Sequence, residues 1–402
     1  MSSYMSILRT PGVARIISAQ LLARFPSGML SLAFLLHIEQ VLGSYGAAGL
    51  VLAATSVGQA VAGPLTSRWM GRWGMRPVIT LTLLISLTSM LTIALVEMSL
   101  GLYMLVGLIC GLSNPPIQPA VRTIYPKLVN SRQLTPLFSL DASAQEIIWV
   151  IGPVVTTFIA VQVSTVLAIL TAAVFLVAGG AWFLSSPEVG RVRIPRSKRA
   201  LGKVLTRKPV LLATIVGFFM VGATAAVEAS VVAVYGHGGP EAGIILAIWA
   251  VGSLAGGLAF GHIPVGPWAL ARRTFIVFVG IAIAGFFLDF WWLSFALLIS
   301  GIGLAPALAV MFGIVSASVK FSDTAEAYGW VGTGQLIGAA LGSAIAGFAI
   351  DSGGASGGFI AAGVLAGLTF LAALLGKPWH PDLRGRDASP MPDTEPVPVQ
   401  PS

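Results

Sequence analysis

Long stretches without a single charged residue constrain this chain more than any other feature. They include residues 40–67, 77–96, 98–121, 147–187, 242–271, 290–319, 327–350 and 352–376. A hydrocarbon core about 30 Å thick is crossed by about 20 helical residues, each rising 1.5 Å. Every one of these stretches is long enough for one crossing, and 147–187 is long enough for two. The pattern predicts a polytopic membrane protein.

The composition excludes several other classes. Of 402 residues, 56% are hydrophobic and 9% are charged, whereas a soluble domain is about one quarter charged. A soluble enzyme, a nucleic-acid binder and a disordered scaffold are therefore not expected. The net charge of +8 does not indicate nucleic acid, because the basic residues lie in short connections between apolar stretches. A single cysteine, Cys110, excludes a disulfide framework and a cysteine-based zinc site.

Twelve helices account for the apolar stretches once 147–187 is divided near Gln162. We expect them near 13–37, 46–66, 77–97, 101–121, 137–160, 165–186, 209–234, 241–262, 273–290, 292–315, 328–350 and 356–376. The short amphipathic strands of an outer-membrane barrel are absent from the sequence. The expected fold class is an all-α polytopic membrane protein.

The distribution of basic residues tests this count. With twelve spans, 22 of the 23 lysines and arginines fall in the N-terminal flank, the even-numbered connections and the C-terminal tail. The odd-numbered connections carry none, and Arg24 lies inside the first helix. By the positive-inside rule, both termini are predicted to be cytoplasmic and the protein to lie in the cytoplasmic membrane.

The chain divides into two halves. Residues 187–208 carry eight basic residues and one acidic residue, and they separate a six-helix half (1–186) from a second one (209–376). The tail, 377–402, has seven prolines in 26 residues and is predicted to be disordered. At a constant offset of 194 the two halves share residue types. The matches are Phe25, Gly28, Ala48, Gly49, Leu52, Ala53, Val57, Gly58 and Gly63 with Phe219, Gly222, Ala242, Gly243, Leu246, Ala247, Val251, Gly252 and Gly257.

Two six-helix repeats joined by a basic connection resemble the major facilitator superfamily, over about residues 10–376. The resemblance implies that the halves rock about a central cavity that opens to each side in turn. Between its second and third helices the family typically has Gly-x-x-x-Asp-Arg-x-Gly-Arg-Arg/Lys. The chain reads Gly63-Pro64-Leu65-Thr66-Ser67-Arg68-Trp69-Met70-Gly71-Arg72, followed by Arg76. Ser67 and Met70 replace the family's acid and internal glycine. The resemblance assigns a cytoplasmic gate role to Gly63, Arg68, Arg72 and Arg76, weakened by these departures.

A second resemblance concerns direction. Gly152-Pro153 matches the core of a glycine motif in the fifth helix of drug-exporting members, although the flanking glycines are missing. The basic residue that many exporters have in the fourth helix is also missing. The resemblance therefore extends to exporters only in part.

Four ionisable residues lie within the predicted spans: Arg24, Asp141, Glu146 and Glu228. Each costs about 2.5–3.5 kcal/mol at a helix centre, so each invites a functional explanation. Glu146 or Glu228 could carry a proton, and Arg24 could compete for that carboxylate or hold an anionic group of the substrate. Alternatively, Arg24 forms a fixed ion pair with Glu146 or Asp141. Asp141 could instead pair with Arg68 or Arg72 as part of the gate.

Helix-breaking residues mark further candidates. Asn114, Pro115 and Pro116 in the fourth helix correspond to Pro306 in the tenth, and irregular backbone at this depth is tolerated beside protein or water. Breaks in both halves predict a cavity-facing site, and a simple packing kink is the alternative. Glu326 is expected to be a solvated helix cap. The histidines offer no metal-binding spacing, and no metal site is predicted.

These features predict a secondary active transporter and not an enzyme. We expect proton-coupled export of a lipophilic or amphipathic small molecule, driven by the proton gradient without a cofactor. The expected partners are this substrate, protons and the lipid bilayer, with no nucleic acid, and the protein is expected to be a monomer. One alternative is a proton symporter for uptake of an organic solute. Another is a non-transporting receptor or lipid-handling protein, against which the repeat and the lack of a catalytic motif argue.

Overall fold

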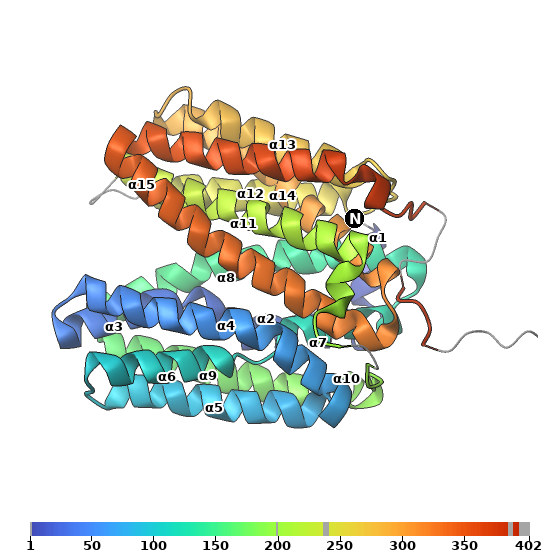
Figure 1. Ribbon diagram of the computed structural model, residues 1–402, viewed down its shortest axis with the longest axis horizontal. Coiled ribbons are helices and arrows are strands. Elements are labelled where there is room, and N and C mark those ends of the chain that lie inside the picture. The colour runs from blue at the N-terminus through green and yellow to red at the C-terminus, as the bar shows by residue number, and fades with distance from the viewer. Residues whose placement is uncertain (1, 198–199, 236–240, 385–388, 394–402) are drawn as a thin grey trace, which may run out of the picture.

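The computed structural model describes residues 2–197, 200–235, 241–384 and 389–393 (Figure 1). These residues are almost entirely helical and contain no strand; Lys320 and Met391 form an isolated bridge. The helices are α1 (Ser2–Leu8), α2 (Val13–Arg24), η1 (Phe25–Gly28), α3 (Leu30–Leu42), α4 (Tyr45–Trp73), α5 (Met75–Leu95), α6 (Leu100–Leu112), α7 (Ile117–Leu128), α8 (Ser131–Gln162), α9 (Thr165–Ser185), α10 (Pro187–Arg191), η2 (Lys203–Thr206), α11 (Lys208–Tyr235), α12 (Glu241–Phe260), α13 (Ala269–Ala284), α14 (Phe290–Ser318), α15 (Phe321–Leu375) and η3 (Lys377–Trp379).

The spans agree with the all-α, twelve-helix prediction. Among the described residues, ten helices are long and apolar enough to cross a membrane. One of them, α15, is two helices joined at Gly354, where a φ of 65° turns the chain. The 16-residue α13 occupies the position of the ninth predicted span. Counting α13 and both parts of α15 gives twelve spans.

Two of the spans are interrupted. The first consists of α2 and α3, separated by the 3-10 turn Phe25–Gly28, where Pro26 cannot donate a backbone hydrogen bond. The fourth consists of α6 and α7, and Ser113–Pro116 between them is not helical. The predicted break at Asn114–Pro116 is thus present, whereas the break in the first span was not foreseen.

The tenth span differs from the prediction. α14 runs through Pro306 without interruption, so the two halves do not share equivalent breaks. Arg273 compensates locally, because its Nη1 donates to the carbonyl oxygen of Pro306 at 2.9 Å and its Nη2 to that of Phe260 at 3.3 Å. The charge pattern assigns Arg273 to the connection before the ninth span, but it is buried within α13, which begins four residues earlier than predicted.

Glycines that match at the offset of 194 make matching contacts. Gly28 packs against the backbone of α8, and its counterpart Gly222 packs against the backbone of α15. Gly63 in α4 meets α15, and its counterpart Gly257 in α12 meets α8. The contacts of Gly28 and Gly222 each lie within one half, whereas the contacts of Gly63 and Gly257 join the two halves. The sequence repeat therefore corresponds to a repeat of helix packing.

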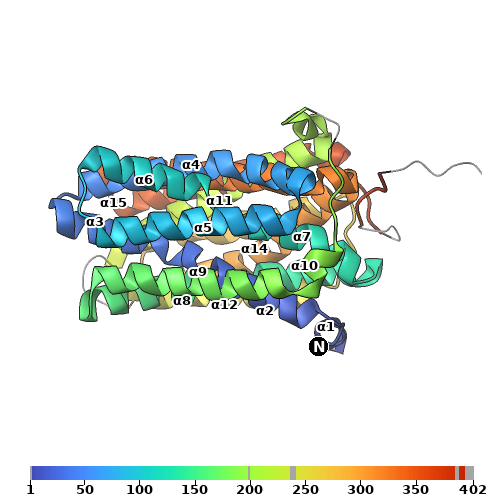
Figure 2. The same ribbon diagram turned by 90° about the horizontal axis from the view of Figure 1, so that it is seen from below.

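The two halves meet near one end of the bundle. We call this the basic end, because the connections rich in lysine and arginine lie there, with α7, α10 and the N-terminus (Figures 1 and 2). In Figure 1 the first part of α15 crosses obliquely and approaches α4 toward this end. The Thr333 hydroxyl donates to the carbonyl oxygen of Ala60 at 2.6 Å, and that of Ser139 to the carbonyl oxygen of Gly257 at 2.6 Å. The conformation is one in which the halves are joined at the basic end.

The C-terminal tail follows the surface of this end. Leu383 donates a backbone hydrogen bond to Val265 at 2.9 Å. Met391 exchanges backbone hydrogen bonds with Val319 and Phe321 at 2.9 and 3.0 Å. Residues 377–384 and 389–393 thus depart from the predicted disorder, because backbone groups pair with two loops of the second half. The rest of the predicted tail lies outside the described residues.

Candidate functional site

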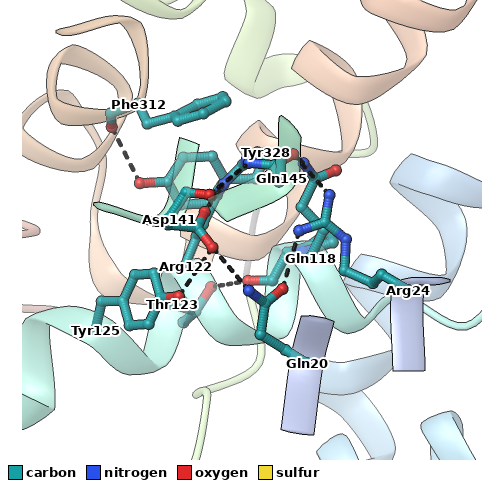
Figure 3. A network of polar contacts seen from close by, with 11 residues as sticks. Gln20, Arg24, Gln118, Arg122, Thr123, Tyr125, Asp141, Gln145, Phe312 and Tyr328 are labelled. Atoms are coloured by element: carbon teal, nitrogen blue, oxygen red, sulfur yellow. Dashed lines mark hydrogen bonds and ion pairs between the residues drawn. The ribbon is translucent and has the colours of Figure 1, made fainter. Parts of the chain in front are cut away.

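A polar layer surrounds Asp141 in α8, which is fully buried (Figure 3). Its Oδ1 accepts hydrogen bonds from Gln20 Nε2 at 2.9 Å and from the Tyr125 hydroxyl at 3.0 Å. Its Oδ2 lies 3.4 Å from Arg122 Nε. The carboxylate is therefore paired and hydrogen-bonded from α2 and α7, as a buried charge requires.

Arg122 is the partner of Asp141 that the sequence analysis missed. It was counted among loop residues, but it lies within α7 with 1% of its surface exposed. Its guanidinium carbon is 3.3 Å from the centre of the Phe312 ring in α14, which belongs to the other half. The alternative pairing of Asp141 with Arg68 or Arg72 is not observed among the described residues. Asp141 is therefore linked to the second half through Arg122.

An aromatic cluster extends this contact between the halves. Phe138 of α8 lies 6.5 Å from both Phe312 and Tyr328, measured between ring centres. The Tyr328 hydroxyl donates to the carbonyl oxygen of Phe312 at 3.0 Å. The rings of Phe312 and Tyr328 lie beside the polar layer on the side of the second half (Figure 3).

Arg24 is the last residue of α2, and its partners are neutral. Its Nη1 donates to Gln20 Oε1 at 2.9 Å and its Nη2 to Gln145 Oε1 at 2.7 Å. Within the described chain it forms no ion pair with Glu146 or Asp141, so both predicted ion pairs are wrong. Gln145, and not its neighbour Glu146, reaches Arg24, because consecutive residues of a helix point about 100° apart.

Glu146 instead faces the second half. The hydroxyl of Ser253 in α12 donates to Glu146 Oε1 at 2.8 Å. Glu228 of α11 interacts electrostatically with Glu146, and its side chain is accessible although protein surrounds it on most sides. No lysine or arginine forms an ion pair with either carboxyl group in the part of the chain that the structure describes. Two carboxyl groups within the membrane-spanning segments, one from each half, are therefore within electrostatic range of each other.

Arg68, one of the predicted gate residues, forms a separate ion pair at the basic end. Arg68 Nη1 lies 3.1 Å from Glu326 Oε2, and Glu326 Oε1 accepts from the backbone N–H of Gly202 at 2.8 Å. Glu326 is buried, so the expectation of a solvated cap is wrong. The pair connects α4, α15 and the central connection. Sequence analysis missed Glu326 because a helix cap and a buried ion-pair partner have the same residue type.

The other gate residues have individual surroundings. Gly63 and Gly329 bring α4 and α15 into backbone contact, since a Cβ on Gly329 would lie 2.6 Å from the carbonyl oxygen of Gly63. Arg72 lies over the Trp73 ring, and Arg76 Nη2 donates to the carbonyl oxygen of Ser186 at 3.4 Å. Within the described residues, Arg68 is the one of the three arginines whose ion pair spans the two halves.

The remaining predicted residues are structural in their observed contacts. Gly152 lies against the backbone of Gly28, and Pro153 lies inside α8. This places the glycine-proline pair where α8 crosses the turn of the first span. Asn114 is exposed, Pro115 is partly exposed and Pro116 is buried. Their proposed role at a cavity stays a prediction.

The fold and these charged groups define a multi-pass membrane transporter built from two six-helix halves. The chain belongs to the Major Facilitator Superfamily, whose sequence model matches residues 16–288 and 259–400. No curated protein matches the chain.

Solved structures of transporters have a similar fold. One is the human organic anion transporter MFSD10 (TETRAN), with a TM-score of 0.68 and 16% identity, covering 90% of this chain and 100% of that one. Another is a bacterial homologue of the iron transporter ferroportin in an outward-facing state, with a TM-score of 0.68 and 14% identity over 91% and 98% of the chains. A third is a single-residue variant of the E. coli fucose:proton symporter FucP, with a TM-score of 0.68 and 15% identity over 90% and 98%.

Proposed function

We propose that the protein is a proton-coupled secondary transporter that exports a lipophilic or amphipathic small molecule across the cytoplasmic membrane. The observation that carries this proposal is the contact of Glu146 with the other half, where the hydroxyl of Ser253 donates to it at 2.8 Å and the charge of Glu228 acts on it without an ion-pair partner for either carboxyl group among the described residues. In this proposal both termini face the cytoplasm, so the basic end is the cytoplasmic side, and the monomer is the functional unit.

Proton coupling follows from the surroundings of the two carboxyl groups. A carboxylate in a region of low dielectric costs free energy unless a cation compensates it. The described residues provide no ion-pair partner, so binding a proton removes that cost. Rocking of the halves separates residues of α8 from those of α12. Loss of the Ser253 hydrogen bond therefore changes the free energy of the charged form of Glu146 as the transporter changes sides.

The nature of the substrate is proposed from the apolar character of the spans. Their mean hydropathy is high, and polar side chains suited to a sugar are scarce in the seventh and tenth helices. Export is favoured by the partial resemblance of Gly152-Pro153 to the exporter motif. Apolar spans would suit a substrate that dissolves in the bilayer.

Proton release from inside-out vesicles tests the proposal. Vesicles containing the protein are given an acid-inside pH gradient, lipophilic compounds are added, and proton release is followed by dequenching of a pH-sensitive dye. Wild type is compared with Glu146→Gln and with Glu97→Gln, an exposed carboxyl group in a loop as the matched control. We expect compound-dependent dequenching that Glu146→Gln loses and Glu97→Gln keeps.

Other outcomes have definite meanings. Dequenching that survives Glu146→Gln keeps antiport and assigns the coupling proton to Glu228 or Asp141. If folded wild-type protein responds to none of the compounds, export of lipophilic molecules is refuted, and proton-coupled uptake of a polar solute becomes the hypothesis to test.

A further inference from the structure

The polar layer in the first half carries more positive than negative charge. Arg24 and Arg122 face a single carboxylate, that of Asp141, and the ion pair that the structure shows is with Arg122. Gln118 connects the two arginines. Its surroundings orient the amide oxygen toward both guanidinium groups, 2.7 Å from Arg122 Nη2 and 3.0 Å from Arg24 Nη2. The neutral amide oxygen of Gln118 thus lies between two guanidinium cations within the membrane-spanning part of the protein.

Arg24 has no direct ion pair among the described residues: Asp141 acts on it electrostatically but is bound to Arg122, so one positive charge of the layer stays in excess. Its acceptors in the structure are the amide oxygens of Gln20, Gln145 and Gln118. A guanidinium group has five N–H donors, and these three bonds leave its Nε–H and one Nη1–H without an acceptor among the described residues. A charge within a membrane costs several kcal/mol unless it is paired. An anion that binds Arg24 would supply the missing charge and acceptor.

Arg24 is also less enclosed than Arg122. It lies at the end of α2, where the first span is interrupted by η1, and its side chain is partly exposed. Arg122 is buried beneath Phe312 and already bound to Asp141. Arg122 is therefore buried and ion-paired, whereas Arg24 is partly exposed and has no ion pair among the described residues.

We infer that Arg24 binds the negatively charged head group of the substrate, and that the substrate is an amphipathic organic anion such as a carboxylate on an apolar body. The inference rests on the proposed transport function. The nearly charge-free helices around the layer accommodate the apolar body, whereas Arg24 offers charge-assisted hydrogen bonds to the head group.

The anion site and the proposed proton site lie on different faces of α8. Gln145 points toward Arg24, and Glu146 points toward Ser253 of the other half. Substrate and proton therefore do not compete for one group. Neutralising Glu146 is expected to leave binding of the anion intact while it abolishes coupling.

Binding to the purified full-length protein in lipid nanodiscs tests the inference separately from transport. The probes are octanoate, 1-naphthaleneacetate and cholate, each compared with its neutral amide, and the readout is the shift of the melting temperature with ligand concentration. The variants are Arg24→Gln, Arg24→Lys and Glu146→Gln. Arg132→Gln, an exposed arginine at the start of α8, is the control.

We expect at least one carboxylate to bind wild type more tightly than its amide by about 10- to 100-fold, the value of a charge-assisted contact. Arg24→Gln should remove this preference, Arg24→Lys should keep part of it, and the other two variants should retain it. If Arg24→Gln does not fold, the preference of wild type for carboxylate over amide and its reduction in Arg24→Lys remain decisive.

Three results overturn the inference. The first is that no carboxylate of the panel binds. The second is equal binding of carboxylate and amide, and the third is a carboxylate preference that Arg24→Gln retains. If neutral or cationic compounds nevertheless drive proton release from vesicles, the proposed transport function stands without the anion site. If carboxylates bind but drive no proton release, the anion site stands and proton-coupled export fails.

Discussion

Closure of the basic end depends on the contact between Gly63 and Gly329, and the variant Gly329→Ala tests this. A Cβ on Gly329 would lie 2.6 Å from the carbonyl oxygen and 2.8 Å from the carbonyl carbon of Gly63. These are backbone atoms that no rotamer change can move, so α4 and α15 must separate. Gly332→Ala is the matched control, because a Cβ at Gly332, three residues further along α15, has no atom within 4 Å.

The expected shift of the conformational equilibrium follows from comparing the two substitutions. Overpacking of a well-packed contact costs about 1–3 kcal/mol. Alanine favours a helix over glycine by roughly 0.5–1 kcal/mol, and this gain is common to both variants. The contact exists only while the halves are joined at the basic end. The difference between the variants therefore shifts the conformational equilibrium away from this state by about 5- to 150-fold.

Distances between spin labels at the basic end measure the shift. Cysteines replace the exposed residues Arg132 and Arg272, one in each half, in a Cys110→Ser background. We expect Gly329→Ala to add a population at longer distance that Gly332→Ala and the parent protein lack. Identical distance distributions for the two glycine variants would refute the reasoning that the crossing of α4 and α15 limits closure.

Three further predictions concern polar contacts of the same conformation. Arg68→Ala removes the partner of the buried Glu326 carboxylate and should disfavour the closed basic end by about 1–3 kcal/mol, between the values of exposed and buried pairs; an unchanged spin-label distribution would contradict this. Asp141→Asn should destabilise the folded protein by roughly 3–5 kcal/mol, because it leaves buried arginine charge uncompensated. A lower melting temperature would show this, with the exposed Asp382→Asn as a control that should not change it. Tyr4→Phe removes a hydrogen bond of 3.0 Å from α1 to the carbonyl oxygen of Gly257. It should destabilise the closed basic end relative to the open one by about 0.5–1.5 kcal/mol. Spin-label distances that match those of wild type would contradict this.

Some candidate residues could be found from sequence and others could not. Glu146, Glu228 and Arg24 were identifiable because a charge within an apolar stretch stands out against its neighbours. Arg122 and Arg273 were not, since each lies at the edge of such a stretch, where a buried arginine and a loop arginine give the same pattern. Only the position of α7 and α13 relative to α14 shows that both are covered.

The sequence by itself determined the number of spans, the all-α class, the two halves and the end at which basic residues collect. These properties depend on hydropathy and charge along the chain, because every backbone polar group in a bilayer must be satisfied within a helix. The tertiary structure decided which charges meet. Arg24 binds Gln145 and not Glu146, Asp141 binds Arg122, and Arg68 binds Glu326. Such pairings depend on how each helix is rotated and which distant helix it faces, and a one-dimensional pattern of apolar residues in lipid does not contain that information.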